Sequence, residues 1–114
     1  MNNCLFCRVI DGDIPSEIVF ESENIVAFKD IQPQAPVHLL IIPKKHISTM
    51  NDLDDSDKEI ISEIIFTAKN LAENHDISTD GYRTIFNCNS AGGQAVYHLH
   101  LHLLGGRQMT WPPG

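Results

Sequence analysis

The segment YHLHLHLL, residues 97–104, alternates histidine with leucine and decides how the rest of the chain can fold around it. Side chains of a β-strand point alternately to opposite faces of the sheet. As a strand, this segment places His98, His100 and His102 on one face and leucines on the other. The leucine face predicts a packed core, and the histidine face predicts a site on the opposite side of the sheet.

The spacing of the three histidines limits what they can do together. Neighbouring side chains on one face of a strand lie about 7 Å apart, so the outer two histidines lie about 13 Å apart. One ring can attack a phosphorus atom and a neighbour can reach the leaving group, but the third must have another role. With a reference pKa near about 6.5, imidazole serves as a nucleophile or as an acid. Surface packing and a pure metal site remain open, and we favour catalysis.

A polar loop, residues 87–94, precedes the histidine row and ends in Gly92, Gly93 and Gln94. Glycines let the backbone approach an anion closely and direct N–H groups at it. A glycine pair by itself usually marks only a turn. Directly before the histidines, this pair predicts a phosphate-binding loop.

The remaining pattern predicts one α+β domain over residues 1–114. We expect a short helix over residues 4–10 and strands over residues 17–20, 24–28, 37–42, 82–86 and 97–103. A long helix is expected over residues 56–74, with Ser56 and Glu59 forming a capping box. Its predicted apolar face, at helical spacing, consists of Ile60, Ile61, Ile64, Ile65, Ala68, Leu71 and Ala72. The strand at 37–42 is apolar on both faces, which predicts a sheet covered on both sides.

Charge and composition exclude several classes of partner. The formal net charge is −7 and the sequence pI is about 5.1. Neutralising nucleic-acid phosphates or anionic membranes requires basic residues, so we expect neither as a partner. The chain starts without the basic and apolar segments of a signal peptide, and its three cysteines are an odd number. We therefore expect a reducing compartment, the cytoplasm or also the nucleus, and no disulfide framework.

Cys4 and Cys7 form a C-x-x-C pair near the N-terminus. The pair is consistent with two small buried residues, or with half of a zinc site, because zinc takes about four ligands. A redox pair is disfavoured because no strand precedes it in a βαβ context. The third cysteine, Cys88, is predicted to be incidental.

The histidine row has the His-x-His-x-His-x-x form of the histidine triad (HIT) family, and the chain resembles its nucleotide-binding HINT branch. Long matching segments, spread over almost the whole chain, carry this resemblance: residues 28–36, 42–47, 92–94, 104–107 and 111–114. The resemblance implies a HIT-like fold with an antiparallel five-stranded sheet, one long helix and a short N-terminal helix. It also implies a homodimer whose two sheets join into one.

The resemblance further implies hydrolysis of purine nucleoside 5′-phosphoramidates, typically of adenosine, to a nucleoside monophosphate and an amine. His100 would attack phosphorus and form a covalent nucleotidyl-histidine, which water then hydrolyses. His102 would contact the phosphate or the leaving group, and His38 would position its neighbours or relay a proton.

The nucleotide-binding residues follow from the same resemblance. Asp30 would accept hydrogen bonds from the ribose hydroxyls, which a carboxylate can do. Without the resemblance, Asp30 is an ordinary turn residue, and Phe6, Ile14 and Phe28 are core residues. With it, the base pocket consists of Phe6, Ile14, Phe28 and Ile31, and the phosphate is held by Asn87, Gly93 and the backbone near Ala95 and Val96.

Relatives that carry the cysteine pair bind a structural zinc ion, and the resemblance places its ligands at Cys4, Cys7, His46 and His98. The chain departs from the pattern at Ala95, where many HINT proteins have a serine that contacts the phosphate or leaving group. Alanine keeps only the backbone N–H.

Other functions remain open on the sequence alone. A dinucleoside polyphosphate hydrolase of the Fhit branch uses the same histidine chemistry, although residues 111–114 resemble HINT proteins. A nucleotide-binding interaction module without turnover is consistent with Ala95. A bare metal-binding protein is the third possibility.

Overall fold

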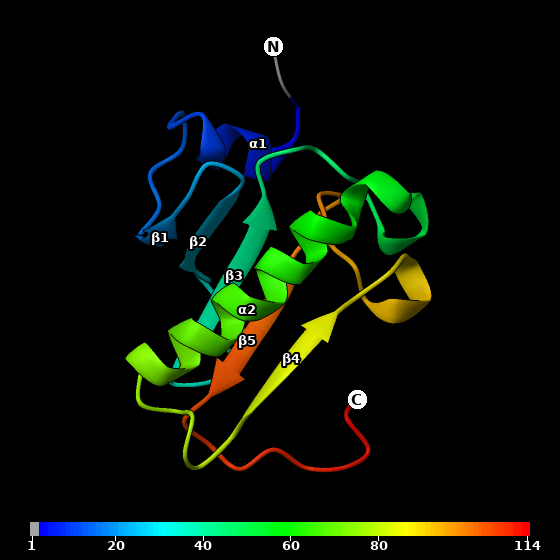
Figure 1. Ribbon diagram of the computed structural model, residues 1–114. Helices are drawn as coiled ribbons and strands as arrows, with labels where there is room; N and C mark the ends of the chain where they lie inside the picture. Colours follow the sequence, from blue (N-terminus) through cyan, green and yellow to red (C-terminus); the bar gives the residue numbers. More distant parts are fainter. Residues whose placement is uncertain (1–2) are drawn as a thin grey trace.

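Five strands form one antiparallel sheet in the order β1-β2-β3-β5-β4 in the computed structural model (Figure 1), which describes residues 3–114. Met1 and Asn2, on which part of the signal-peptide prediction rests, lie outside the described residues. The strands are β1 (Ile18–Glu21), β2 (Ile25–Lys29), β3 (Val37–Pro43), β4 (Tyr82–Phe86) and β5 (Leu101–Gly105). The predicted five-stranded α+β fold, with one long and one short helix, is confirmed.

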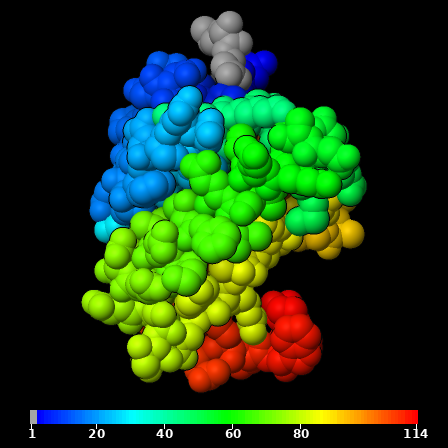
Figure 2. Space-filling model, in the orientation of Figure 1, coloured from blue at the N-terminus to red at the C-terminus, as the bar shows by residue number. Residues whose placement is uncertain are grey.

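Two helices cover opposite faces of the sheet. Helix α2 (Lys58–Asn74) lies across one face, as Figures 1 and 2 show, and its buried residues share a core with Leu101 and Leu103. Helix α1 (Leu5–Ile10) packs Phe6 and Val9 against the other face. The central strand β3 is buried along nearly its whole length, because it contributes to both cores. This agrees with its apolar sequence on both faces.

Helix α2 begins later than the sequence predicted. Its first residue is Lys58, and two short 3₁₀ turns, η1 (Met50–Asp52) and η2 (Asp55–Asp57), precede it. The predicted capping box at Ser56 and Glu59 is wrong. Capping boxes form instead in η1, from Thr49 to Asp52, and in η2, from Asp54 to Asp57. In each turn an aspartate three residues after the N-cap, Asp52 or Asp57, accepts from the N-cap N–H, so the helix starts only after the second of these boxes.

One position of the predicted apolar face of α2 is also wrong. Ile65 is 52% exposed, whereas Thr67 is buried. Ile64, Ala68, Leu71 and Ala72 are buried as predicted, and Ile60 and Ile61 pack at the edge of the core. The buried stripe is therefore narrower than hydrophobicity alone suggests.

The histidine strand is shorter than predicted. Strand β5 begins at Leu101, and the segment before it, including His98 and His100, bends instead of pairing. The alternation persists, since Leu99, Leu101 and Leu103 are all at most 2% exposed. The bend lets the first two histidines turn in directions that a flat strand would not allow.

Short connections complete the chain. A third 3₁₀ turn, η3 (Ser90–Gly92), lies between β4 and β5, and the C-terminal residues run along the β4 side of the sheet (Figure 1). Among residues 3–114, no helix is long and apolar enough to span a membrane.

Candidate functional site

The histidine-rich segment distributes its three imidazoles among three different neighbourhoods. His98 faces the cysteine pair of α1, His100 lies against Phe6, and His102 lies beside His38 of β3. The Leu99 N–H donates to the Ile47 carbonyl oxygen at 2.6 Å, which ties the bent segment to the loop after β3. The rings of His100 and His102 nonetheless stay close, with centroids 4.8 Å apart.

A hydrogen bond fixes which nitrogen of His100 is available for attack. Its Nδ1 lies 2.8 Å from the His98 carbonyl oxygen, which can only accept a hydrogen bond. Nδ1 therefore carries the hydrogen, and Nε2 of the neutral ring holds a lone pair. Burial lowers the pKa of His100 below its usual value, which keeps the ring neutral near pH 7. His100 thus has the tautomer that a nucleophile requires.

His102 is oriented by a chain of hydrogen bonds that starts on the backbone. The Gln34 N–H donates to His38 Nδ1 at 3.0 Å, so the hydrogen of a neutral His38 is on Nε2. That Nε2 lies 2.9 Å from His102 Nδ1 and 3.4 Å from Asp30 Oδ2. His102 Nδ1 therefore accepts, and its own hydrogen is on Nε2. The chain leaves His102 with an N–H to offer to a phosphoryl oxygen or a leaving group.

The environment keeps His102 uncharged. Burial, then the nearby His100 and His38, lower the pKa of His102 to about 4, against an opposing contribution from Asp30. Burial also lowers the pKa of His38, and again Asp30 opposes the shift. At pH 7 the resting site is a cluster of neutral imidazoles beside one carboxylate. Such a cluster accepts a phosphate anion with hydrogen-bond donors rather than with full positive charge.

A largely apolar cavity of about 400 Å³ opens next to the reactive rings. It lies between α1, the segment after it, the end of β2 and the middle of β3. Most of the residues predicted to bind nucleotide line it together with His100 and His102: Phe6, Ile14, Phe28, Asp30, Ile31, Ala95 and Val96. Asp30 stands at the wall with one carboxylate oxygen accepting from the Gln32 N–H at 2.8 Å.

Three of the predicted catalytic and nucleotide-binding residues do not line this cavity. His38 and Asn87 line a smaller neighbouring cavity of about 250 Å³, which His102 also borders. Gly93 lines neither cavity, and its left-handed backbone, with φ of +83°, closes the η3 turn. The adjacent Gln94 is buried, and its side chain bonds to the backbone of Asn89, Ser48 and Val96. Residues 92–94 therefore line neither cavity, and they hold the backbone around the site through the hydrogen bonds of Gln94.

Sequence reasoning missed several lining residues. Val9 lies one helical turn after Phe6, and Leu40 lies two strand positions after His38, so both could have been found from periodicity. The others lie in loops or at element ends, where no periodic signal exists. The missed residues are Leu5, Val9, Pro15, Ser16, Lys29, Gln32 and Leu40.

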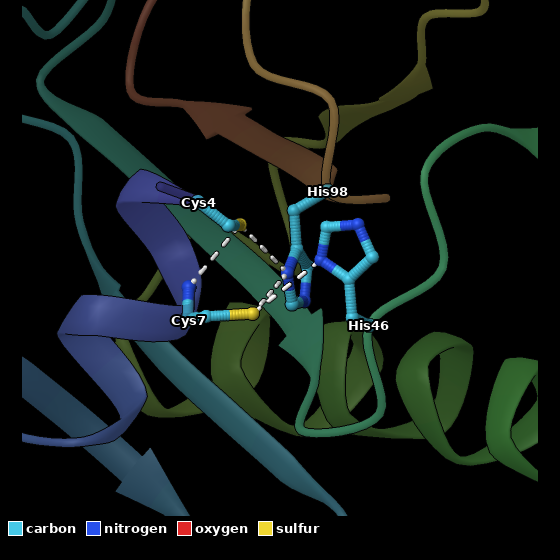
Figure 3. Close-up of side chains that lie close together, drawn as sticks. All are labelled: Cys4, Cys7, His46 and His98. Carbon is cyan, nitrogen blue, oxygen red and sulfur yellow. Dashed lines mark hydrogen bonds between the residues drawn. The ribbon is translucent and has the colours of Figure 1, made fainter. Parts of the chain in front are cut away.

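The four predicted metal ligands converge from three separate segments, as Figure 3 shows. Cys4 and Cys7 come from the start of α1, His46 from the loop after β3, and His98 from the segment before β5. Each offers one ligand atom, and these atoms lie within 4.8 Å of one another. Cys4 Sγ lies 3.3 Å from His98 Nδ1, and Cys7 Sγ lies 3.4 Å from His46 Nδ1 and 3.5 Å from His98 Nδ1.

These separations fit tetrahedral zinc. Sulfur and nitrogen ligands at the usual zinc distances lie about 3.3 to 3.8 Å from one another. The fully buried His98 has its Nε2 2.8 Å from the Pro43 carbonyl oxygen. Nε2 therefore carries the hydrogen and Nδ1 directs its lone pair at the two sulfurs. A backbone acceptor of this kind commonly fixes the orientation of a metal-binding histidine.

Comparisons with known proteins agree with this architecture. A family model described as "Scavenger mRNA decapping enzyme C-term binding" matches residues 3–111. The purine nucleoside phosphoramidase of Escherichia coli is 47% identical over 105 residues, which cover 92% of this chain and 88% of that protein.

Solved structures give the same answer. A HIT family hydrolase from Legionella pneumophila superposes with a TM-score of 0.97 at 63% identity, covering 98% of this chain and 100% of that one. A histidine triad protein from Clostridium difficile gives a TM-score of 0.92 at 39% identity, with 96% of each chain covered. Together with the histidine cluster, these matches show that the chain belongs to the histidine triad (HIT) family and is one of its hydrolases.

Proposed function

We propose that this HIT hydrolase cleaves the P–N bond of purine nucleoside 5′-phosphoramidates, with adenosine preferred. The observation that carries the proposal is the tautomer of His100, which leaves the lone pair on Nε2 of a ring that lines an apolar cavity together with Asp30. The cavity has space for a purine against Phe6, Ile14, Phe28 and Ile31. The name of the Escherichia coli relative supports the same substrate class.

The proposed reaction has two displacements at phosphorus. In the first, His100 Nε2 bonds to phosphorus, the P–N bond to the amine breaks, and the amine leaves with that electron pair and gains a proton. In the second, water attacks phosphorus, the bond to His100 breaks, and a proton leaves the water. The products are a nucleoside monophosphate and a free amine. Splitting the reaction in this way is the usual advantage of a covalent intermediate.

Other residues bind or position the substrate in this proposal. Asp30 accepts from the ribose hydroxyls. His102 donates its Nε2–H to the phosphate or the departing amine, and His38 holds that tautomer from behind. Asn87, Gly93 and the backbone near Ala95 and Val96 are proposed to hold the phosphate. Ala95 offers its backbone N–H in place of a hydroxyl.

The decisive test follows amine release from adenosine 5′-phosphoramidate by the purified protein and by His100→Ala. Loss of the nucleophile is expected to lower kcat by on the order of 10³-fold or more. A matched control is His75→Ala, which removes the histidine that caps the C-terminal end of α2 and lines neither cavity. Rapid mass spectrometry at neutral or alkaline pH should detect the nucleotidyl adduct in the native chain only.

The outcome separates the alternatives. Faster hydrolysis of diadenosine triphosphate than of the phosphoramidate would favour an Fhit-like dinucleoside polyphosphate hydrolase. Binding of AMP without any turnover would favour a nucleotide-binding interaction module, and Ala95→Ser would then test whether the missing hydroxyl is the reason. Equal turnover in the native protein and His100→Ala would contradict the proposed nucleophile.

We also propose a structural zinc ion at Cys4, Cys7, His46 and His98. The donor set of two thiolates and two imidazoles is typical of closed structural zinc sites. His98 directs its Nδ1 lone pair inward while His100, two residues later, turns toward the nucleotide cavity. Such an ion would hold α1 against the histidine segment and leave the chemistry to the other rings.

The homodimer is proposed on the exposed edge formed by β4 and α2. Strand β4 ends the sheet, so its outer backbone groups have no strand partner among residues 3–114. Ile65, Phe66 and Tyr82 are all exposed, and Ile65 and Tyr82 border a hollow between α2 and β4. An open edge strand beside exposed apolar side chains is a surface that proteins usually cover.

A further inference from the structure

We infer that the smaller cavity beside His102 receives the leaving group and selects amines that carry an anionic group, a carboxylate in the first place. The inference rests on the proposed phosphoramidate hydrolysis and names the substrate class of that reaction more closely. It is carried by Arg83 and Arg107, which line this cavity together with His38, Asn87 and His102.

The position of the cavity relative to the reactive atoms gives the first argument. His102 lines both cavities, whereas His100 lines only the nucleotide cavity. In an in-line displacement, the attacking and leaving atoms lie on opposite sides of phosphorus. With the nucleoside in the large cavity and His100 attacking, the amine departs away from His100. The smaller cavity is the space that adjoins the site beyond His102.

The charge of the cavity gives the second argument. Every lysine lies within 4 Å of a carboxylate: Lys29, Lys44, Lys45, Lys58 and Lys69. Arg83 and Arg107 instead donate to backbone carbonyl oxygens, those of Thr110 and Gln34, both at 2.8 Å. Among residues 3–114, no carboxylate lies within 4 Å of either guanidinium, and none lines the cavity.

Backbone carbonyls position these two guanidiniums, and no carboxylate among residues 3–114 forms an ion pair with either one, although Arg107 also borders a separate hollow that Asp76 and Asp80 line. A backbone carbonyl uses one of the five N–H donors of a guanidinium and leaves its positive charge in place. The chain has a net charge of −7. A cavity lined by two arginines and no acidic residue is therefore a positively charged region on a negatively charged protein. A guanidinium matches a carboxylate with two parallel hydrogen bonds, and it also binds phosphate-like groups. A cavity of about 250 Å³ suits a small amine of amino-acid size.

The chemistry of the step is unchanged by the added group. The P–N bond to the anionic amine breaks as His100 Nε2 bonds to phosphorus, and the amine leaves with the electron pair and gains a proton. The arginines bind the remote anion and so place the leaving nitrogen beside His102. Remote binding of this kind raises kcat/KM for the substrate that carries the group.

The test compares four adenosine 5′-phosphoramidates by kcat/KM. One has unsubstituted ammonia as the leaving group, and the others have β-alanine, β-alaninamide and 2-aminoethylphosphonate. We expect β-alanine to exceed β-alaninamide by on the order of tenfold, since a hydrogen bond to a charged group is stronger than one to a neutral amide. The preference should shrink as salt is raised. The phosphonate tells whether the cavity recognises a planar carboxylate or any anion.

Substitutions of Arg83 and Arg107 test whether these two residues cause the preference for the anionic leaving group. In Arg83→Gln and in Arg107→Gln, the β-alanine to β-alaninamide ratio should fall severalfold toward one, and Arg83→Lys should retain part of it. A ratio measured within one preparation is insensitive to how much of the protein is folded, and comparing the ratios of the native protein and a variant cancels the intrinsic reactivity of the two amines. Arg8→Gln, on α1 and outside both cavities, is the matched control and should keep the native ratio.

The outcomes distinguish this inference from the function beneath it. An anionic preference that both glutamine variants lower supports the inference. Turnover of the unsubstituted phosphoramidate with equal rates for β-alanine and β-alaninamide overturns it and leaves the proposed function standing. A preference that survives both substitutions also overturns it. No His100-dependent turnover of any of the four compounds overturns the proposed function, and the inference with it.

Discussion

At the residue scale, the site depends on which nitrogen of each histidine carries hydrogen. His100 and His98 each donate to a backbone carbonyl oxygen, but through different nitrogens, Nδ1 in one and Nε2 in the other. The lone pair of His100 therefore lies on Nε2, beside the nucleotide cavity, whereas that of His98 lies on Nδ1, facing the cysteines. The backbone carbonyl that accepts from each ring thus decides which nitrogen keeps a lone pair, so two histidines only two residues apart offer different nitrogens for bonding.

The first prediction concerns the pH dependence of stability through His102. Burial, then the nearby His100 and His38, lower its pKa in the folded chain to about 4, from an ordinary value of 6.5. A histidine whose folded pKa is lowered contributes its full stability above the unfolded pKa and loses it as pH falls toward the folded pKa. The unfolding free energy should therefore decrease between about pH 6.5 and pH 4. Urea unfolding at closely spaced pH values measures it.

His102→Asn isolates the contribution of this one group. The pKa values of other buried histidines are lowered in the same way, so the variant should still retain some pH dependence of stability. The variant should lose less stability than the native chain over this window. Parallel curves for the two proteins would contradict the low pKa of His102.

At the element scale, α2 stabilises the sheet through a narrow buried stripe. Ile64 is fully buried and lies in the same core as Leu101 and Leu103. These two leucines are the sequence neighbours of His102 in β5, and their side chains lie on the opposite face of the sheet from it. The core side of the sheet therefore fixes the position of the strand whose other face carries the chemistry.

Ile64→Ala should lower the unfolding free energy by about 2 to 5 kcal/mol, because it leaves a cavity in a close-packed core. Ser62→Ala, an exposed position on the same helix, is the matched control and should change it by at most about 0.5 kcal/mol. Chemical denaturation of the three proteins gives the comparison. A cost below about 1 kcal/mol for Ile64→Ala would contradict this account of the core.

The zinc prediction also belongs to the element scale, because α1 has only six residues. A helix this short is not stable by itself in water. We expect about one zinc ion per chain by elemental analysis and a lower Tm after treatment with a strong chelator, since metal binding adds to folding free energy.

Variants of the cysteines test the zinc site directly. Cys7→Ser should lose most of the zinc and lower the Tm, whereas Cys88→Ser, outside the cluster, should retain both. Full zinc content in Cys7→Ser, or a Tm unaffected by the chelator, would contradict the proposed site.

At the scale of the whole molecule, the prediction is that two chains associate through β4 and α2. Analytical ultracentrifugation should give a particle of about twice the 12.8 kDa mass of the chain. Phe66→Glu places a charge on the exposed apolar edge and should shift the particle toward a single chain. Arg8→Glu, on the opposite face, should leave the native mass. A native protein that sediments as one chain would contradict the dimer.

Periodicity in the sequence was enough to predict most of the fold. Alternating leucines located the buried face of β5, and the spacing of Ile64, Ala68, Leu71 and Ala72 located the core face of α2. These signals survive because burial of apolar area is the main driving force of folding and follows the period of each element. The helix start at Lys58 escaped prediction because four aspartates, an asparagine and a serine in residues 51–57 offer several competing caps.

The sequence by itself determined that the histidines, the cysteine pair and Asp30 are present in a pattern typical of the HIT family. Only the tertiary structure decided how they are used. The bend before β5 turns His98 toward Cys4 and Cys7, the Gln34 N–H sets the tautomer of His38, and the return of the C-terminal segment brings Arg107 beside Arg83. The physical reason is that a pattern specifies which face a side chain takes, whereas hydrogen bonds and charge depend on partners from distant parts of the chain.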